Sequence, residues 1–417
     1  MATITASSLY KVFGPRPERG VEALRDGSTS AQLRDKGLIA AVIDASFDVR
    51  PGEIFVVMGL SGSGKSTLIR MVNGLFRPTS GSVEIDGEDV SRLTGDKLRQ
   101  VRRRKVSMVF QHFALLPHRT VGENAAYALQ VQGVNKTDRR AKAEEALQMV
   151  GLEGWGDSMP GELSGGMRQR VGLARALASG TEIMLMDEAF SALDPLIRRE
   201  MQDQLVELQQ KLGKTVLFIT HDLNEAMRLG DRIAMMRDGR IEQIGTAEEI
   251  LNDPANNYVA QFVQDVDRAR VLVAGNVMEA PVAVLGGEQG PLAAQKLMRE
   301  HQLPNLLVLN RDRSLKGLVW ERDVAAAVAR QDPGLPLVEV GRLPVVADDT
   351  LMADLFTVSA ENDCPLIVTD AGKRVAGVIA RSTLLAAAGT PEPSALDSSL
   401  DSSDAEFSMD AVQEATV

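Results

Sequence analysis

A glycine-rich motif at residues 59–67 constrains this chain more than any other feature. The motif fits the pattern of a phosphate-binding loop, Gly59-Leu60-Ser61-Gly62-Ser63-Gly64-Lys65-Ser66-Thr67. The run before it, residues 53–58, predicts a buried strand, and residues 67–73 predict the start of a helix. Glycines let the backbone close around a phosphate chain, and the helix adds the positive end of its dipole. We therefore expect all nine residues to form a nucleotide site in a fold of alternating strands and helices.

Two acidic residues further along the chain complete the predicted site. Residues 182–188 form an apolar run that ends in Asp187 and Glu188, as in a central parallel strand that delivers carboxylates to its C-terminal end. We expect Lys65 to reach the β- and γ-phosphates, and Ser66 and Asp187 to hold Mg²⁺. Glu188 would be the base, or the polarising group, for an attacking water. ATP and Mg²⁺ are the expected cofactors.

The composition excludes several classes of protein. The 417 residues are enough for two to three domains, and they contain no run of eighteen or more apolar residues and no visible secretory signal. The single cysteine, Cys364, excludes an internal disulfide and is predicted to be a buried thiol in a reducing compartment. A net charge of −11 argues against nucleic acid as the main partner.

Residues 162–170, Glu-Leu-Ser-Gly-Gly-Met-Arg-Gln-Arg, introduce a family resemblance. They resemble the signature of the ATP-binding-cassette (ABC) ATPases, with Met167 where the family has Gln. Ser164, Gly165 and Gly166 open a helix whose N–H groups can bind a γ-phosphate. The alternative is an ordinary helix cap by Ser164.

Further marks of the family follow in its usual order, and the resemblance implies their roles. Gln111 matches the Q-loop, which senses Mg²⁺ and water and contacts the transport partner. Residues 191–194 match the D-loop, in which Asp194 approaches a nucleotide. His221, after the predicted strand 215–220, matches the switch histidine that positions the γ-phosphate and the catalytic water. The catalytic set implied in this way is Lys65, Gln111, Glu188 and His221.

The residue that stacks on adenine and the roles of the other histidines are predicted from weaker signals. Phe13 aligns best with the family's adenine-stacking aromatic residue, and Tyr10 is the second choice. His112, His118 and His301 are predicted to be surface or packing residues.

The resemblance covers residues 1–262 and implies a cassette domain over residues 1–265. Its expected parts are a RecA-like core, an antiparallel β subdomain and a helical subdomain. Family members pair head to tail, so each ATP would lie between the Lys65 loop of one copy and the Ser164 loop of the other. ATP closes such a homodimer, and hydrolysis opens it.

Three segments point to one subfamily. They are an insert at residues 15–37, with helical pieces at 21–24 and 30–33 before a strand at 43–49, and the strings 110–117 and 186–198. Together they resemble the ATPase subunits of glycine betaine/proline-type importers, the quaternary-amine uptake family. This implies a peripheral subunit on the cytoplasmic face of the inner membrane, bound to a permease and through it to a substrate-binding protein. Residues 113–117 would receive the permease's coupling helix, or would be internal packing.

The substrate stays open at this stage. Glycine betaine, choline, carnitine and proline would all require the same motor, and a soluble ABC ATPase without a permease is the alternative from another class.

The C-terminal third contains an internal repeat of period 60, in which residues 306–310 recur as 366–370 and residues 317–320 as 377–380. It resembles a tandem pair of cystathionine-β-synthase-type (CBS) modules over residues 271–388. Such pairs bind adenine nucleotides or sense ionic strength. Asp323 fits the ribose-binding acid in the first repeat, or a helix first-turn acid, and Thr383 replaces it in the second.

Two charged segments lie outside these motifs. The basic run at residues 102–105 is predicted to be a solvated face. The tail at residues 389–417 is acidic and is predicted to be disordered.

Overall fold

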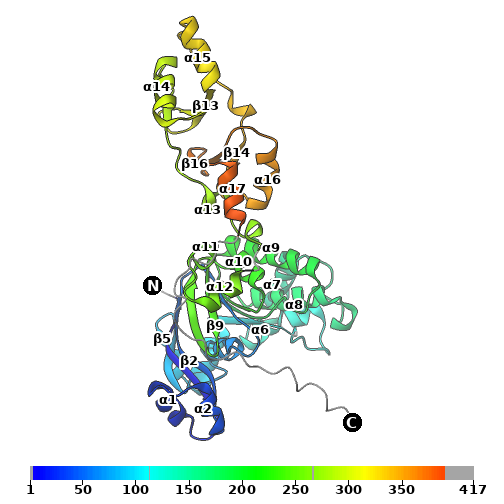
Figure 1. Ribbon diagram of the computed structural model, residues 1–417. Coiled ribbons are helices and arrows are strands. Elements are labelled where there is room, and N and C mark those ends of the chain that lie inside the picture. The colour runs from blue at the N-terminus through cyan, green and yellow to red at the C-terminus, as the bar shows by residue number, and fades with distance from the viewer. Residues whose placement is uncertain (1–2, 112, 265–266, 390–417) are drawn as a thin grey trace, which may run out of the picture.

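The computed structural model describes residues 3–111, 113–264 and 267–389, so His112 and the predicted tail from residue 390 on lie outside the described residues. A larger body, which we call the cassette, holds the phosphate-binding loop (Figure 1). Residues 267–389, which we call the module, stand on it as an extension. In the described part of the chain, no helix is long and apolar enough to cross a membrane.

A six-stranded sheet in the order β10-β9-β3-β8-β7-β6 forms the centre of the cassette. All neighbouring pairs are parallel except β9 and β10. Every residue of β3, β7 and β8 is buried, as expected for strands covered on both faces. Because β6, β7, β8 and β3 are adjacent and parallel, their carboxyl ends meet at one edge of the sheet. The strands are β3 Ile54–Met58, β6 Val106–Phe110, β7 Ile183–Asp187, β8 Thr215–Thr220, β9 Arg232–Arg237 and β10 Arg240–Gly245.

A second, antiparallel sheet in the order β2-β1-β4-β5 packs beside the core. β2 begins at residue 39, four residues before the predicted start, because its first residues pair with the end of β1. The strands are β1 Ile4–Phe13, β2 Ile39–Val49, β4 Ser80–Ile85 and β5 Glu88–Asp89.

The insert between β1 and β2 folds as predicted into two helices, α1 (Pro17–Arg25) and α2 (Ser30–Asp35), both longer than expected. They have a small apolar core of their own, which includes Tyr10, Leu24 and Leu33.

Helices cover both faces of the core sheet (Figure 1). A separate helical layer of α5, α7 and α8 packs together at one side of the cassette. The cassette helices are α3 Lys65–Val72, α4 Gly95–Arg104, α5 Val121–Ala125, α6 Tyr127–Val131, α7 Lys136–Met149, α8 Gly165–Ala178, α9 Pro195–Leu212, α10 Leu223–Leu229, α11 Ala247–Asn252 and α12 Asn257–Val263.

The module consists of two repeats that follow the predicted pattern of helix, strand, turn, strand and helix. Each repeat also has a three-residue parallel strand, β11 or β14, which is too short for a sequence pattern to reveal. Besides α13 (Ala274–Val277), the first repeat has β11 Val284–Gly286, α14 Pro291–His301, β12 Asn305–Leu309, β13 Leu315–Trp320 and α15 Glu321–Arg330. The second has β14 Val345–Ala347, α16 Met352–Ala360, β15 Leu366–Thr369, β16 Val375–Ile379 and α17 Arg381–Ala388.

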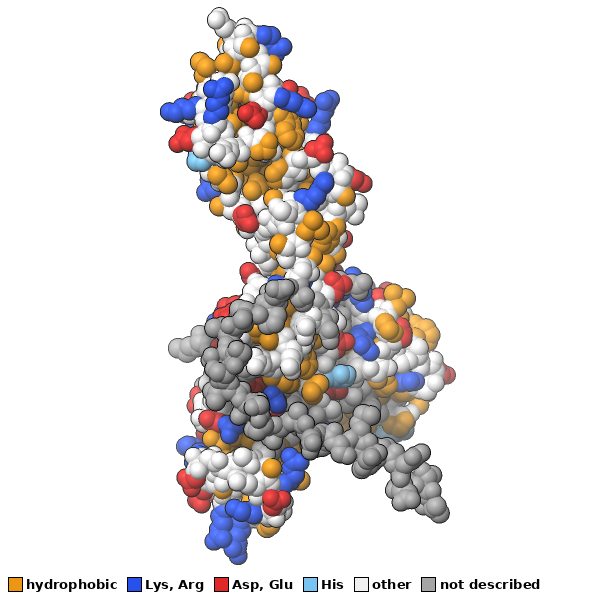
Figure 2. Space-filling view, in the orientation of Figure 1, with side chains coloured by type: hydrophobic (Ala, Val, Ile, Leu, Met, Phe, Trp, Pro, Cys, Tyr) orange, Lys and Arg blue, Asp and Glu red, His pale blue; other side chains and the backbone are white. Residues whose placement is uncertain are grey.

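The second repeat, not the first, joins the module to the cassette (Figure 1). Ile250 and Leu251 of α11 belong to one continuous apolar cluster with Met352 and Leu355 of α16. Arg268 crosses this junction: its side chain donates to the carbonyl oxygen of Leu251 (3.3 Å), to the Asn252 side chain and to the carbonyl oxygen of Ala387 in α17 (3.1 Å). The first repeat has its own apolar core at the far end. Hydrophobic side chains gather on the module surface where the repeats meet (Figure 2).

Candidate functional site

The phosphate-binding loop joins β3 to α3, which begins at Lys65, two residues earlier than predicted. Gly59 and Gly64 have φ angles of 154° and 102°. A Cβ atom would lie 2.1 Å from the Met236 carbonyl oxygen at Gly59 and 2.1 Å from the Ala41 carbonyl oxygen at Gly64. Only glycine fits these two positions, so the loop keeps the tight path that a phosphate cradle needs.

Lys65 lies across this loop and is 4% exposed. Its Nζ donates to the carbonyl oxygens of Gly59 (2.8 Å) and Leu60 (2.9 Å) and lies 4.0 Å from Glu188 Oε1. Burial lowers the pKa of the Lys65 ammonium, and the nearby carboxylates of Glu188 and Asp187 oppose this shift. The side chain is therefore positioned to meet an anion at the loop.

Asp187 ends β7 at the same edge of the sheet. The Ser66 hydroxyl donates to Asp187 Oδ1 at 3.0 Å. Burial raises the pKa of the Asp187 carboxyl group, whereas the Ser66 hydrogen bond and the charge of Arg70 lower it, and burial has the larger effect. A hydroxyl and a carboxylate oxygen side by side are hard oxygen ligands of the kind that Mg²⁺ takes. In residues 3–111, 113–264 and 267–389, no group of three or more His, Cys, Asp or Glu side chains could hold a metal alone.

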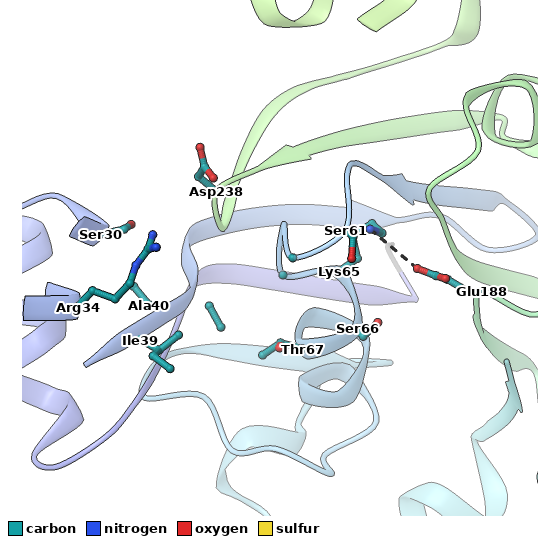
Figure 3. A pocket seen from close by; sticks show the side chains of 13 residues that line it. Ser30, Arg34, Ile39, Ala40, Ser61, Lys65, Ser66, Thr67, Glu188 and Asp238 are labelled. Carbon is teal, nitrogen blue, oxygen red and sulfur yellow. Dashed lines mark ion pairs between the residues drawn. The ribbon is translucent and has the colours of Figure 1, made fainter. Parts of the chain in front are cut away.

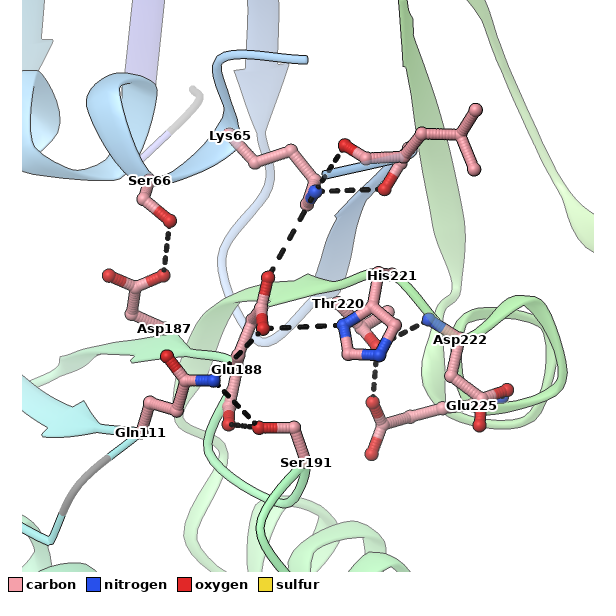
Figure 4. Close-up of polar contacts among 12 residues, drawn as sticks. Lys65, Ser66, Gln111, Asp187, Glu188, Ser191, Thr220, His221, Asp222 and Glu225 are labelled. Carbon is pink, nitrogen blue, oxygen red and sulfur yellow. Dashed lines mark hydrogen bonds and ion pairs between the residues drawn. The ribbon is translucent and has the colours of Figure 1, made fainter. Parts of the chain in front are cut away.

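Glu188 follows directly in the left-handed region, with φ 47°. A non-glycine residue there costs about 1–3 kcal/mol, and the Glu188 N–H donates to the Ile219 carbonyl oxygen at 3.0 Å. Its Oε2 atom lies 3.3 Å from Gln111 Nε2 and 3.3 Å from His221 Nδ1 (Figure 4). Three adjacent strands, β6, β7 and β8, thus bring the predicted catalytic side chains together.

A buried network behind His221 was not predicted. Glu225 of α10 accepts a hydrogen bond from the Thr220 hydroxyl (Figure 4) and another, at 3.0 Å, from Gln202 Nε2 of α9. The Asp222 N–H donates to Thr220 Oγ1 at 3.0 Å, and burial raises the pKa of Glu225. The network fixes the backbone on both sides of His221. The one sequence signal, Asp222 three residues before Glu225, predicts only a helix cap.

Arg198 of α9 was also missed, although it links two predicted motifs. Its guanidinium donates to the carbonyl oxygens of Ser191 (3.3 Å) and Leu193 (3.0 Å) and lies 3.4 Å from Asp222 Oδ2. Ser191 Oγ in turn lies 3.2 Å from Gln111 Nε2. The segment 191–194 and the turn after β8 are therefore braced against each other.

The signature residues and Asp194 are not brought to the Lys65 loop. Ser164 caps α8 by accepting from the Met167 N–H at 3.3 Å, and Asp194 caps α9 by accepting from the Ile197 N–H at 3.1 Å. Neither they nor Gly165 and Gly166 line the cleft at the loop. Within one chain, the capping role is the one that the geometry shows.

The loop opens into a cleft of about 490 Å³ (Figure 3). It is lined by most of the phosphate-binding loop, Glu188, residues 39–41 of β2, part of α2 and Asp238. Phe13 pairs with Ile39 and so lies on the same face of the sheet, packed against Phe76 at 5.7 Å between ring centroids. Tyr10 is instead buried in the insert core beneath Arg25. His118 and His301 are exposed, as predicted.

A parallel core sheet with this loop, an antiparallel side sheet and a helical layer define a P-loop nucleotide-binding cassette. Residues 42–191 match the family described as ABC transporter. The chain is 46% identical to the glycine betaine transport ATP-binding protein OpuAA of Bacillus subtilis, over 92% of both chains. The chain belongs to the family of ABC transporter ATP-binding subunits of which this protein is a member.

This chain is also similar to a second transport ATP-binding protein and to a solved cassette structure. A trimethylamine N-oxide transport ATP-binding protein, TmoW of Ruegeria pomeroyi, is 47% identical over 79% of this chain and 95% of its own. The solved dimeric cassette MJ0796, named as a bacterial ABC transporter cassette, is 34% identical, with a TM-score of 0.50 over 58% of this chain and 98% of its own. The predicted family, the cassette fold and the ATPase class are confirmed.

Proposed function

We propose that this chain is the ATP-hydrolysing subunit of an importer for glycine betaine or a related small methylated zwitterion. The convergence of Lys65, Gln111 and His221 on Glu188 carries the hydrolysis, because Lys65 and Glu188 line the cleft at the phosphate-binding loop. The similarity to OpuAA over nearly the whole of both chains supports the substrate class. The name of TmoW adds trimethylamine N-oxide to the candidates beside choline and carnitine.

The residues of the cleft divide the chemistry among them. Lys65 neutralises charge on the β- and γ-phosphates, and its buried position strengthens that interaction. Glu188 accepts the proton of an attacking water or orients that water, and His221 holds the γ-phosphate opposite it. Mg²⁺, held by Ser66, Asp187 and Gln111, would neutralise charge on the phosphate oxygens.

We propose a head-to-tail homodimer as the active form. Ser164, Gly165 and Gly166 lie at the start of α8 outside their own cleft, where the helix N-terminus is free to meet a phosphate. The relative MJ0796 is named as a dimeric cassette. In this arrangement Ser164 of the partner subunit would complete each site, and Asp194 would lie near the join.

A groove on the cassette supports a permease partner. It has a volume of about 520 Å³ and is lined by Arg99, Arg102 and Arg103 of α4 together with Tyr127 and Val131 of α6. The basic run at residues 102–105 is exposed or half-buried, in agreement with the predicted solvated face, and two of its arginines also line this groove. An apolar wall beside arginines fits a short amphipathic segment, and we assign the groove, with residues 113–117 at its edge, to the permease's coupling helix. Such a subunit would lie on the cytoplasmic face of the inner membrane, and the permease would connect it to a substrate-binding protein.

We propose that the module is a tandem CBS pair that regulates transport, bounded as predicted at residues 271–388, with the cassette at 1–265 and an acidic tail from 389. A cleft of about 390 Å³ includes residues of both repeats, among them Val284, Arg313 and Val375. It would suit a regulatory adenine nucleotide. Asp323 does not line it and instead lies 3.7 Å from Arg322, which favours the first-turn role over ribose binding.

Uptake by the reconstituted complex tests the proposal. Labelled glycine betaine uptake is measured with ATP inside the vesicles, with choline, carnitine and trimethylamine N-oxide as competitors, at two ionic strengths. Glu188→Gln is the matched control and should abolish uptake. Failure to copurify with any permease in gentle detergent, or uptake without ATP, would contradict the proposal.

A further inference from the structure

The insert between β1 and β2 reaches the nucleotide cleft. Ser30 and Arg34 of α2 form part of its wall, at the end away from Lys65 (Figure 3). The catalytic side chains use none of these residues. The insert is therefore placed to touch whatever part of a ligand extends out of the phosphate-binding loop.

The helix that carries Arg34 is anchored at the edge of the cleft. α2 begins with a capping box, in which Thr29 and Gln32 exchange side-chain and backbone hydrogen bonds of 2.9 and 3.3 Å. Leu33, the residue before Arg34, is fully buried in the insert core. The capped helix and its buried anchor thus place Arg34 at the wall of the cleft, where its exposed side chain can meet a ligand.

The same end of the cleft has an apolar floor. Ile39, the first residue of β2, is 60% exposed and lines the cleft beside Ala40 and Ala41. Asp238 is the other charged side chain at this end, and its carboxylate lies 3.4 Å from Arg237. An aliphatic surface next to a guanidinium suits a flat aromatic heterocycle, because the guanidinium stacks on or over a π-face.

We propose that Arg34 contacts the purine base of the bound nucleotide, which lies against Ile39. This rests on the proposed function only in that ATP occupies the cleft. Lys65 fixes the phosphates at one end, so the base of the same nucleotide extends toward the insert. The insert thus provides part of the base-binding surface, in addition to Phe13 on the neighbouring strand.

Competition binding with the full-length chain tests this proposal. A ribose-labelled fluorescent ATP analogue is displaced by ATP or by inorganic tripolyphosphate, which has the phosphates but no base. Arg34→Ala should weaken ATP binding by about threefold to tenfold, and leave tripolyphosphate binding unchanged. Arg34→Lys, which keeps the charge without the planar group, should fall between. Arg19→Ala, an exposed arginine of α1, is the matched control and should change neither.

The outcomes separate the possible failures. Equal losses for ATP and tripolyphosphate would mean that Arg34 acts on the phosphates through its charge, and would overturn the proposal. Unchanged ATP binding by Arg34→Ala would also overturn it, while leaving the ATPase assignment intact. In the assembled transporter, the Michaelis constant for ATP should rise and the maximal rate should stay the same. If the wild-type chain binds neither ATP nor tripolyphosphate, the proposed function fails as well.

Discussion

Arg268 offers the sharpest test of how the module is held, and we predict that Arg268→Ala undocks it. Arg268 is 9% exposed, and its side chain makes two hydrogen bonds across the junction, to Leu251 and Asn252, and a third to Ala387 within the module. Hydrogen bonds from a charged donor contribute about 1.5–3 kcal/mol each, but the released acceptors at this junction regain water. We therefore expect docking to weaken by about 2–4 kcal/mol in total, which is roughly a 30-fold to 1,000-fold change in the docking equilibrium.

The assay compares limited proteolysis and thermal unfolding of the full-length chain. Wild-type protein should resist cleavage at the junction, whereas Arg268→Ala should be cut there first and should unfold in two separated transitions. In the transporter, the variant should keep ATP-driven uptake and lose its response to salt. Removing the whole module is a poorer experiment, because it would bare Ile250 and Leu251 of the shared apolar cluster.

Two further variants serve as controls for this prediction. Arg299→Ala removes an exposed arginine from α14 in the far repeat and should behave as wild type. Arg268→Lys keeps the charge but cannot span three acceptors, so its cleavage rate should be intermediate. If Arg268→Ala is cut and unfolds like the wild type, the junction does not depend on this side chain.

Three other predictions concern the site and the groove. Glu188→Gln should bind ATP but lower turnover about 10²–10⁴-fold, seen as a closed dimer in gel filtration; wild-type-like hydrolysis would exclude Glu188 as the key group. Arg103→Glu should reduce copurification of the permease about tenfold, whereas Arg104→Glu, on the same helix but outside the groove lining, should not; equal effects would refute the assignment of the groove. Burial raises the pKa of Glu225, so the folded chain keeps a proton there that the unfolded chain loses, and stability falls as pH rises above about 4.3. The thermal midpoint of Glu225→Gln should thus gain on that of wild type as the pH rises above about 4.3; a constant difference would contradict this reasoning.

The core strands could be predicted well because their environment leaves a mark in the sequence. β8 has the predicted bounds, residues 215–220, since strands buried on both faces are continuous apolar runs between polar turns. Because both residues lie at or directly after the carboxyl end of a predicted buried strand, Asp187 and His221 could be expected at the same edge of the sheet. β2 and α3 begin earlier than predicted. Pairing with β1 decides where β2 begins, and the path of the phosphate-binding loop decides where α3 begins, and neither can be read from the local sequence.

What the sequence did not reveal depends on segments that meet only in the fold. Arg198 and Glu225 each sit in an ordinary amphipathic helix, and their contacts come from the approach of α9 and α10 to the turn after β8. Arg102 and Arg103 of the basic run line a groove only because residues of α6 lie on its other side. The role of Arg34 likewise follows from the insert folding back onto the cleft.

Because the module attaches through its second repeat, it can dock on the cassette only after nearly the whole chain has been synthesised. The repeat nearest the cassette is the one synthesised last, and 119 residues separate Arg268 from Ala387. At about 5–20 residues per second, the ribosome needs roughly 6–24 s to cover that distance. During this interval Ile250 and Leu251 lack the part of their apolar cluster that the second repeat supplies. The nascent cassette therefore exposes apolar surface until the module docks. Chaperone binding, or mispairing with a second nascent chain, would occur mainly during this interval.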